Sequence, residues 1–134
     1  MRPNILVVDD SKRMRNIVRE TLGAYDCDVA EAANGFNAFF VIERARTDLI
    51  LLDVSMPLMG GLETLARLKA APELAAIPVI MLTSPADHAL MGEWAALGAV
   101  GALVKPFSGE QLAGKVREIL ILRPLPQTPP SCGG

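Results

Sequence analysis

Short aliphatic runs alternate with longer amphipathic stretches along the chain. Four runs cover residues 5–8, 49–52, 79–82 and 102–104, and a weaker one covers 27–30. Runs of this length, some of them rich in β-branched residues, are typical of strands that are buried on both faces of a parallel sheet. We therefore predict five short strands at these positions.

The stretches between the runs have the spacing of amphipathic helices. In the first stretch, Ser11 is a suitable N-cap, and four apolar residues then share one helix face: Met14, Ile17, Val18 and Leu22. Comparable patterns predict four more helices, which begin at about 34–35, cover 61–70, cover about 86–97 with Gly98 as the stop, and begin near 108.

A strand followed by a helix, five times over, indicates an open parallel sheet with helices on both faces. The chain has 134 residues, which suits one domain and is too short for an eight-fold barrel. We therefore predict a doubly wound α/β fold. In such folds ligands bind at the carboxyl ends of the strands, so the residues that follow the aliphatic runs are the candidates for chemistry.

Composition and charge exclude several classes of protein. Hydrophobic residues make up 51% of the chain, yet no uninterrupted apolar stretch approaches the 18 or so residues of a membrane span. The apolar run at 5–8 is too short for a signal peptide and stops at Asp9, so we expect a cytoplasmic protein without a membrane segment. The net charge of −2 and the scattered lysines and arginines argue against direct nucleic-acid binding.

Common catalytic and cofactor motifs are missing from the sequence. Cys27 and Cys132 have neither the spacing of a metal site nor that of a disulfide framework, and the single histidine leaves little material for a catalytic triad. No glycine-rich phosphate loop is present, so nucleotide binding is not indicated.

The composition changes after residue 122. Residues 123–134 contain four prolines and show no periodicity, which is typical of a disordered tail or a linker. We therefore predict one domain over residues 3–122, followed by a proline-rich segment that is either a natural terminus or a connection to a further domain.

Charged and polar residues follow the predicted strands. Asp9 and Asp10 follow the first run, Asp53 the third, Thr83 the fourth and Lys105 the fifth. Three carboxylates at close range repel one another unless a cation lies between them, and Mg²⁺ is a cation that prefers such oxygen ligands. A metal ion, an ammonium and a hydroxyl around a carboxylate are what phosphoryl transfer to an aspartate requires.

Four motifs resemble those of the receiver domain of two-component response regulators, of the single-domain chemotaxis type. They are LVVDDS at 6–11, LLDVSMP at 51–57, MLTS at 81–84 and VKPF at 104–107. The resemblance covers about residues 3–122. It implies a flavodoxin-like receiver fold with a five-stranded parallel sheet in the order 2-1-3-4-5.

The resemblance also implies roles for individual residues. Asp53 is expected to accept a phosphoryl group from a sensor histidine kinase or a histidine phosphotransfer protein. Mg²⁺ is the expected cofactor, held directly by Asp10 and Asp53, through water by Asp9, and by the backbone carbonyl of Ser55. Thr83 and Lys105 are expected to hold phosphoryl oxygens, and the bond between Lys105 and Pro106 is expected to be cis.

The implied protein is a signalling module and not an enzyme with an external substrate. It catalyses only its own phosphorylation and dephosphorylation, and it acts on an unknown output partner through the surface of the fourth helix, the fifth strand and the fifth helix. Ala102 departs from the family, because many receivers have a tyrosine or phenylalanine there that moves on activation. Either backbone motion reshapes the output surface, or Trp94 or Met91 of the fourth helix replaces that aromatic; the alternative for Trp94 is buried packing. Phe36 with Phe40 form either a local apolar pair or a partner patch.

Two alternatives use the same residues. Phosphatases of the haloacid dehalogenase type also form an aspartyl-phosphate, but they need a second aspartate at position 55, where this chain has serine, and a cap domain. The other alternative is a receiver fold that serves as a scaffold independent of phosphorylation. Ala102 mildly favours the scaffold, whereas the complete set of Asp9, Asp10, Asp53, Thr83 and Lys105 argues against it.

Overall fold

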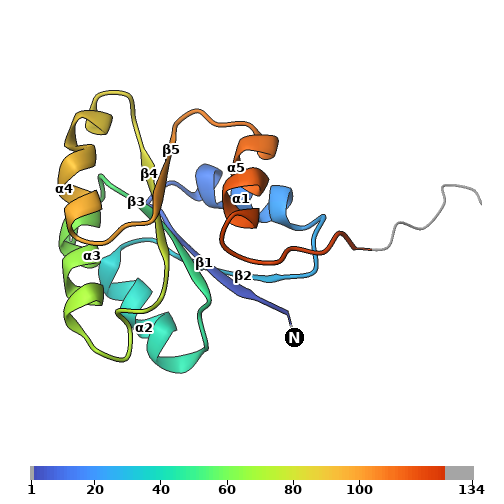
Figure 1. The fold of residues 1–134 in the computed structure, drawn as a ribbon, viewed down its shortest axis with the longest axis horizontal. Coiled ribbons are helices and arrows are strands. Elements are labelled where there is room, and N and C mark those ends of the chain that lie inside the picture. Colours follow the sequence, from blue (N-terminus) through green and yellow to red (C-terminus); the bar gives the residue numbers. More distant parts are fainter. Residues whose placement is uncertain (1, 126–134) are drawn as a thin grey trace, which may run out of the picture.

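The computed structural model describes residues 2–125 and contains one sheet and five α-helices (Figure 1). The strands are β1 (Asn4–Val8), β2 (Asp28–Ala32), β3 (Leu49–Asp53), β4 (Val79–Thr83) and β5 (Gly101–Val104). The helices are α1 (Lys12–Leu22), α2 (Gly35–Arg44), α3 (Gly61–Ala70), α4 (Met91–Ala96) and α5 (Gly109–Arg117), with a 3₁₀ turn, η1 (Asp87–Leu90), before α4. All strand pairs are parallel, and their order is β2-β1-β3-β4-β5, which confirms the predicted topology.

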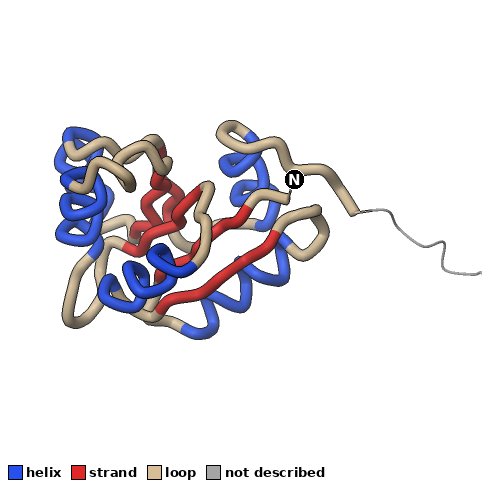
Figure 2. The backbone as a smooth tube through the Cα atoms, turned by 90° about the horizontal axis from the view of Figure 1, so that it is seen from below, coloured by secondary structure: helices blue, strands red, loops and turns tan. Residues whose placement is uncertain are grey.

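The sheet lies between two helical layers (Figures 1 and 2). Alternate strand residues face opposite layers, so that Ile5 and Val7 of β1 pack with α1 and α5, whereas Leu6 and Val8 pack with α2, α3 and α4. Both faces of the central strands are therefore covered, which explains why β1, β3 and β4 are continuous apolar runs and not alternating ones.

The helices begin where the capping residues predict. The Ser11 hydroxyl accepts a hydrogen bond from the Met14 amide at 3.2 Å, and the Asn34 side chain accepts one from the Asn37 amide at 2.9 Å. Ser108 forms a reciprocal capping box at the start of α5. These bonds satisfy backbone donors that the first turn of a helix leaves free.

Two elements differ from their predicted ranges. β2 lies one to two residues later than the predicted strand at 27–30; it is an edge strand whose side chains are mostly only half-buried, and this weakens its apolar pattern. The predicted helix at 86–97 is divided, because the Ser84 hydroxyl binds both the amide (3.1 Å) and the carboxylate (3.0 Å) of Asp87 and stabilises η1 before α4 begins. Gly98 follows α4 with a positive φ of 102°, as a helix-ending glycine should.

The chain after α5 continues along the loop that precedes β2. The Asp26 amide donates to the Arg123 carbonyl at 2.7 Å, and the Leu125 amide donates to the Ala24 carbonyl at 2.9 Å. The first three residues of the predicted tail at 123–134 are therefore held against the domain. Residues 126–134 lie outside the described part of the chain. Within the part that is described, no helix has both the length and the apolar character needed to cross a membrane.

The aromatic side chains divide between core and surface. Trp94 is 2% exposed and packs in the core beneath α3 and α4, which confirms that it is buried packing. Phe36 and Phe40 on α2 are more than half exposed, and the guanidinium of Arg44 lies 3.4 Å from the centre of the Phe40 ring. A cation over an aromatic face covers part of this apolar pair without a partner.

Candidate functional site

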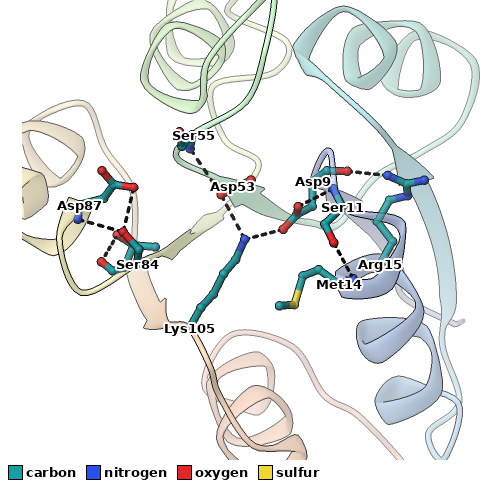
Figure 3. Close-up of polar contacts among 10 residues, drawn as sticks. Asp9, Ser11, Met14, Arg15, Asp53, Ser55, Ser84, Asp87 and Lys105 are labelled. Atoms are coloured by element: carbon teal, nitrogen blue, oxygen red, sulfur yellow. Dashed lines mark hydrogen bonds and ion pairs between the residues drawn. The ribbon is translucent and has the colours of Figure 1, made fainter.

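Three strand ends bring charged side chains together at one edge of the sheet (Figure 3). Asp9 directly follows β1, Asp53 is the last residue of β3, and Lys105 directly follows β5. Because these strands are parallel and close in the sheet order, their carboxyl ends meet at the same edge. The predicted convergence of these residues is confirmed.

The ammonium of Lys105 lies between two carboxylates, as Figure 3 shows. Its Nζ atom is 2.8 Å from Oδ2 of Asp9 and 3.3 Å from Oδ1 of Asp53. Burial alone would lower the pKa of Lys105, but the hydrogen bond to Asp9 and the negative charges of Asp53 and Asp9 outweigh it, and the pKa is raised. Lys105 is therefore a fixed positive charge in this site. The bond between Lys105 and Pro106 is cis, as predicted.

The surroundings of Asp53 disfavour its ionised form. It is only 5% exposed, and Asp9 beside it is fully buried. Burial, followed by repulsion from Asp9, raises the pKa of Asp53 from 3.8 to about 6, although Lys105 and the Ser55 amide act in the opposite direction. One lysine does not balance the negative charge of this cluster, so a further cation would be attracted to the site.

The acidic cluster has the donor set of a hard divalent cation. Carboxylate oxygens of Asp9, Asp10 and Asp53 lie within 4.8 Å of one another, and Asp10 is exposed while the other two are buried. The cluster thus opens toward solvent on the side of Asp10. Oxygen donors at this spacing, with access to water, suit Mg²⁺, which takes few carboxylates and keeps several waters.

Backbone contacts hold the two central carboxylates in place. The Ser11 amide donates to Oδ1 of Asp9 at 2.9 Å, and the Ser55 amide lies 3.4 Å from Oδ1 of Asp53. Gly61 at the start of α3 packs against the carbonyl of Asp53, and a Cβ there would lie only 2.7 Å from the Cα of Val54. The loop after β3 is therefore closely packed beneath the site, and this packing is possible because Gly61 has no side chain.

Thr83 and Ser55 lie at the predicted edge of the sheet, and their roles toward a phosphoryl group and a metal ion stay predictions. Thr83 is buried at the end of β4, and its hydroxyl donates to the Ser84 carbonyl at 3.1 Å and not to a carboxylate of the cluster. Ser55 contributes its amide to Asp53, while the role of its carbonyl as a metal ligand stays a prediction.

Arg15 is a site residue that the sequence did not reveal. Its Nη1 atom donates to the backbone carbonyl of Asp9 at 2.7 Å, and its Nε atom donates to Glu31 at 3.0 Å. In the sequence Arg15 is one of several basic residues on the polar face of α1. Only the pairing of β1 with β2, which puts Val7 opposite Glu31, shows that it lies beside the acidic turn.

A groove lies beside the site, between β5 and α5. Its volume is about 430 Å³, and its lining includes Ala102, Phe107, Gln111 and Lys115. Ala102 is half-buried and packs against the core cluster on the side of α2, α3 and α4. Met91 on α4 is about half exposed, and Trp94 is in the core; neither lines this groove, whose aromatic lining residue is Phe107.

Comparison with known proteins gives a consistent result. Residues 5–117 match the model of the response regulator receiver domain. The chain is 33% identical over 123 residues to sporulation initiation phosphotransferase F of Bacillus subtilis, a match covering 92% of this chain and 98% of that protein. It is 34% identical over 116 residues to chemotaxis protein CheY-3 of Vibrio cholerae, over 86% of this chain and 89% of that one. The solved structure of the Vibrio cholerae chemotaxis protein CheY4 has a TM-score of 0.84 at 35% identity, covering 90% of this chain and all of the other.

Proposed function

The chain belongs to the response regulator receiver domain family, and on this premise we propose that Asp53 is its phospho-acceptor. The observation that carries the proposal is the position of Asp53 at the end of the central strand β3, with the ammonium of Lys105 at 3.3 Å and two more carboxylates beside it. A relative of similar length is named a phosphotransferase, which supports phosphoryl transfer as the chemistry.

In the proposed reaction a carboxylate oxygen of Asp53 attacks the phosphorus of a phosphohistidine. An O–P bond forms, the P–N bond breaks, and its electron pair returns to the imidazole nitrogen of a sensor histidine kinase or histidine phosphotransfer protein. Lys105 is placed to neutralise a phosphoryl oxygen, and Thr83 on the neighbouring strand supplies a hydroxyl once it leaves the Ser84 carbonyl. Attack of water on the same phosphorus releases phosphate and restores Asp53.

Mg²⁺ fits the cluster as the cofactor, with Asp9, Asp10, Asp53 and the Ser55 carbonyl as its proposed protein ligands. When bound, it supplies positive charge that offsets the negative charge on the transferring phosphoryl group. The chain's own contribution is to hold the carboxylates in one place, which the amides of Ser11 and Ser55 do. The domain is proposed to catalyse only its own phosphorylation and dephosphorylation.

The signal is proposed to leave through the face formed by α4, β5 and α5. A phosphoryl group adds about −1.5 to −2 charge. Lys105 would be attracted to this charge, and because Lys105 directly follows β5, its movement would reach that strand. The groove between β5 and α5 lies on this face, so the output partner is proposed to meet an open surface whose lining includes Phe107. We assign residues 3–122 to the receiver domain and 123–134 to a tail or linker, in a protein that works in the cytoplasm.

The direct test is phosphorylation by a small phosphodonor. Incubation with acetyl phosphate and Mg²⁺ is expected to add one phosphoryl group, detected by intact mass. Asp53→Asn is expected to abolish the addition, whereas Asp28→Asn, which changes an exposed carboxylate of β2, is expected to retain it. Labelling of Asp53→Asn to the level of the unmodified protein would overturn the proposal, and turnover of a phosphomonoester would favour the phosphatase alternative.

A further inference from the structure

An arginine on α1 joins the acidic turn to the edge strand of the sheet. The guanidinium of Arg15 donates through Nη1 to the backbone carbonyl of Asp9 at 2.7 Å, as Figure 3 shows. Through Nε it donates to Oε1 of Glu31 on β2 at 3.0 Å. The Arg15 side chain is only 15% exposed, so both bonds are largely shielded from solvent. Hydrogen bonds from a charged group to a shielded acceptor are among the stronger ones in proteins.

The bonded carbonyl lies at a sensitive point of the chain. Asp9 and Asp10 are outside β1 and α1, in the short turn between them, and the peptide that contains the Asp9 carbonyl leads directly to Asp10. Asp10 is exposed, and no hydrogen bond to its side chain is found among residues 2–125. The direction of its carboxylate toward Asp9 and Asp53 therefore depends on the backbone of this turn.

Glu31 holds the arginine in this position. One carboxylate oxygen binds Arg15, and the other binds Nε of Arg19 at 2.7 Å. The hydrogen bond from Arg19, together with a weaker effect of the one from Arg15, outweighs the raising effect of burial and lowers the pKa of Glu31, so it stays ionised as the partner of both. Arg19 also donates to the Val29 carbonyl at 2.9 Å, on β2 and away from the acidic turn.

We propose that Arg15 is a positioning residue for the metal site, which sets the acidic turn so that Asp10 and Asp53 can share one cation. The inference rests on the proposed function in one respect, that the cluster binds Mg²⁺. Residues that orient metal ligands without touching the metal typically contribute about 10- to 100-fold to metal affinity. Arg15 belongs to this class because it binds the backbone of the ligand segment and is itself fixed by Glu31.

Arg19 provides a matched control for Arg15. Both are arginines of α1, both bind Glu31 through Nε, and both donate to a backbone carbonyl. Only Arg15 reaches the turn that contains the ligands. If Arg15 had a purely structural role, Arg15→Met and Arg19→Met would change the Mg²⁺ affinity and the stability by similar amounts, because each removes one ion pair with Glu31 and one hydrogen bond to a backbone carbonyl.

The test is Mg²⁺ binding measured by isothermal titration calorimetry, together with urea unfolding of the same samples. Arg15→Met is expected to raise the Kd for Mg²⁺ about tenfold or more. Arg15→Lys is expected to recover part of the lost affinity. Arg19→Met is expected to have a Kd within about twofold of that of the unmodified protein. Glu31→Gln keeps Arg15 but weakens its ion pair, so its Kd for Mg²⁺ is expected to lie between those of Arg15→Met and Arg19→Met. It replaces Arg15→Met in the test if Arg15→Met does not fold.

The outcomes separate the two proposals. If the unmodified protein does not bind Mg²⁺, the proposed metal site fails and this inference fails with it. If the unmodified protein binds Mg²⁺ and Arg15→Met binds it as well as Arg19→Met does, the metal site stands and the positioning role of Arg15 is overturned. If Arg15→Met does not fold, a Kd for Glu31→Gln equal to that of the unmodified protein overturns it instead.

Discussion

Removal of the charge of Asp53 should stabilise the metal-free protein. The carboxylate is buried beside Asp9, and its pKa is raised from 3.8 to about 6. A difference of about 2 in pKa between the folded and unfolded states corresponds to about 3 kcal/mol in the free energy of unfolding. Asp53→Asn keeps the shape of the side chain without the charge, and Lys105 retains Asp9 at 2.8 Å as its partner.

The effect has a defined dependence on pH. Below about pH 3 Asp53 is protonated in both states, so the unmodified protein carries no cost. As the pH rises from 3.8 toward 6, the unfolded chain releases the proton and the folded chain retains it, so folding becomes less favourable. Above pH 6 the full cost is present. Asp53→Asn should therefore be more stable by about 2–3 kcal/mol at about pH 7.5, and the difference should approach zero near about pH 3.

The assay is urea unfolding in the presence of a chelator, followed by the fluorescence of Trp94, which is 2% exposed in the folded protein. Asp28→Asn is the matched control, because Asp28 is exposed and its ion pair with Arg2 at 3.3 Å is a surface contact; its stability should follow that of the unmodified protein at every pH. Addition of Mg²⁺ should stabilise the unmodified protein more than Asp53→Asn. The reasoning is refuted if Asp53→Asn is the less stable protein at about pH 7.5, or if its advantage does not change with pH.

Three further outcomes are expected. Lys105→Met leaves Asp9 and Asp53 without their shared cation, so phosphorylation by acetyl phosphate should slow at least about tenfold by intact mass; an unchanged rate would contradict the role of Lys105. Gly61→Ala places a Cβ against the Asp53 carbonyl, so urea unfolding should show a loss of about 1–3 kcal/mol, whereas Gly92→Ala, with open space around it, should lose nothing; equal effects would contradict the packing argument. Chelation of Mg²⁺ should abolish labelling of the unmodified protein, and labelling at an undiminished rate would count against the cofactor.

The sheet and most of the site could be predicted because their signals are local. A strand buried on both faces must be a continuous apolar run, and the residue that ends the run must lie at the sheet edge. Asp9, Asp53 and Lys105 follow from this rule, since they follow or close such runs. The α4 region was less predictable, because a single side chain, Ser84, binds Asp87 and produces the 3₁₀ turn that periodicity does not report.

The contacts that were not predicted depend on register and not on local pattern. Arg15 and Glu31 are 16 residues apart and belong to different elements. They meet only because β1 and β2 are paired with Val7 opposite Glu31, and an edge strand such as β2 has too weak an apolar pattern to reveal its register. The hydrogen bond from the Thr83 hydroxyl to the Ser84 carbonyl could not be predicted either. The sequence places Thr83 at the end of its strand but does not give the direction of its hydroxyl.

The central claim is that the phosphoryl group is carried by the carboxylate of Asp53. An aspartyl-phosphate is an acyl phosphate, which borohydride reduces to the alcohol, so the labelled residue is converted to homoserine. Peptide mass mapping after reaction with acetyl phosphate, Mg²⁺ and then borohydride should locate one homoserine, at position 53, the last residue of β3. Homoserine at Asp9 or Asp10 in place of Asp53, or phosphate on a hydroxyl that survives the reduction, would contradict the account.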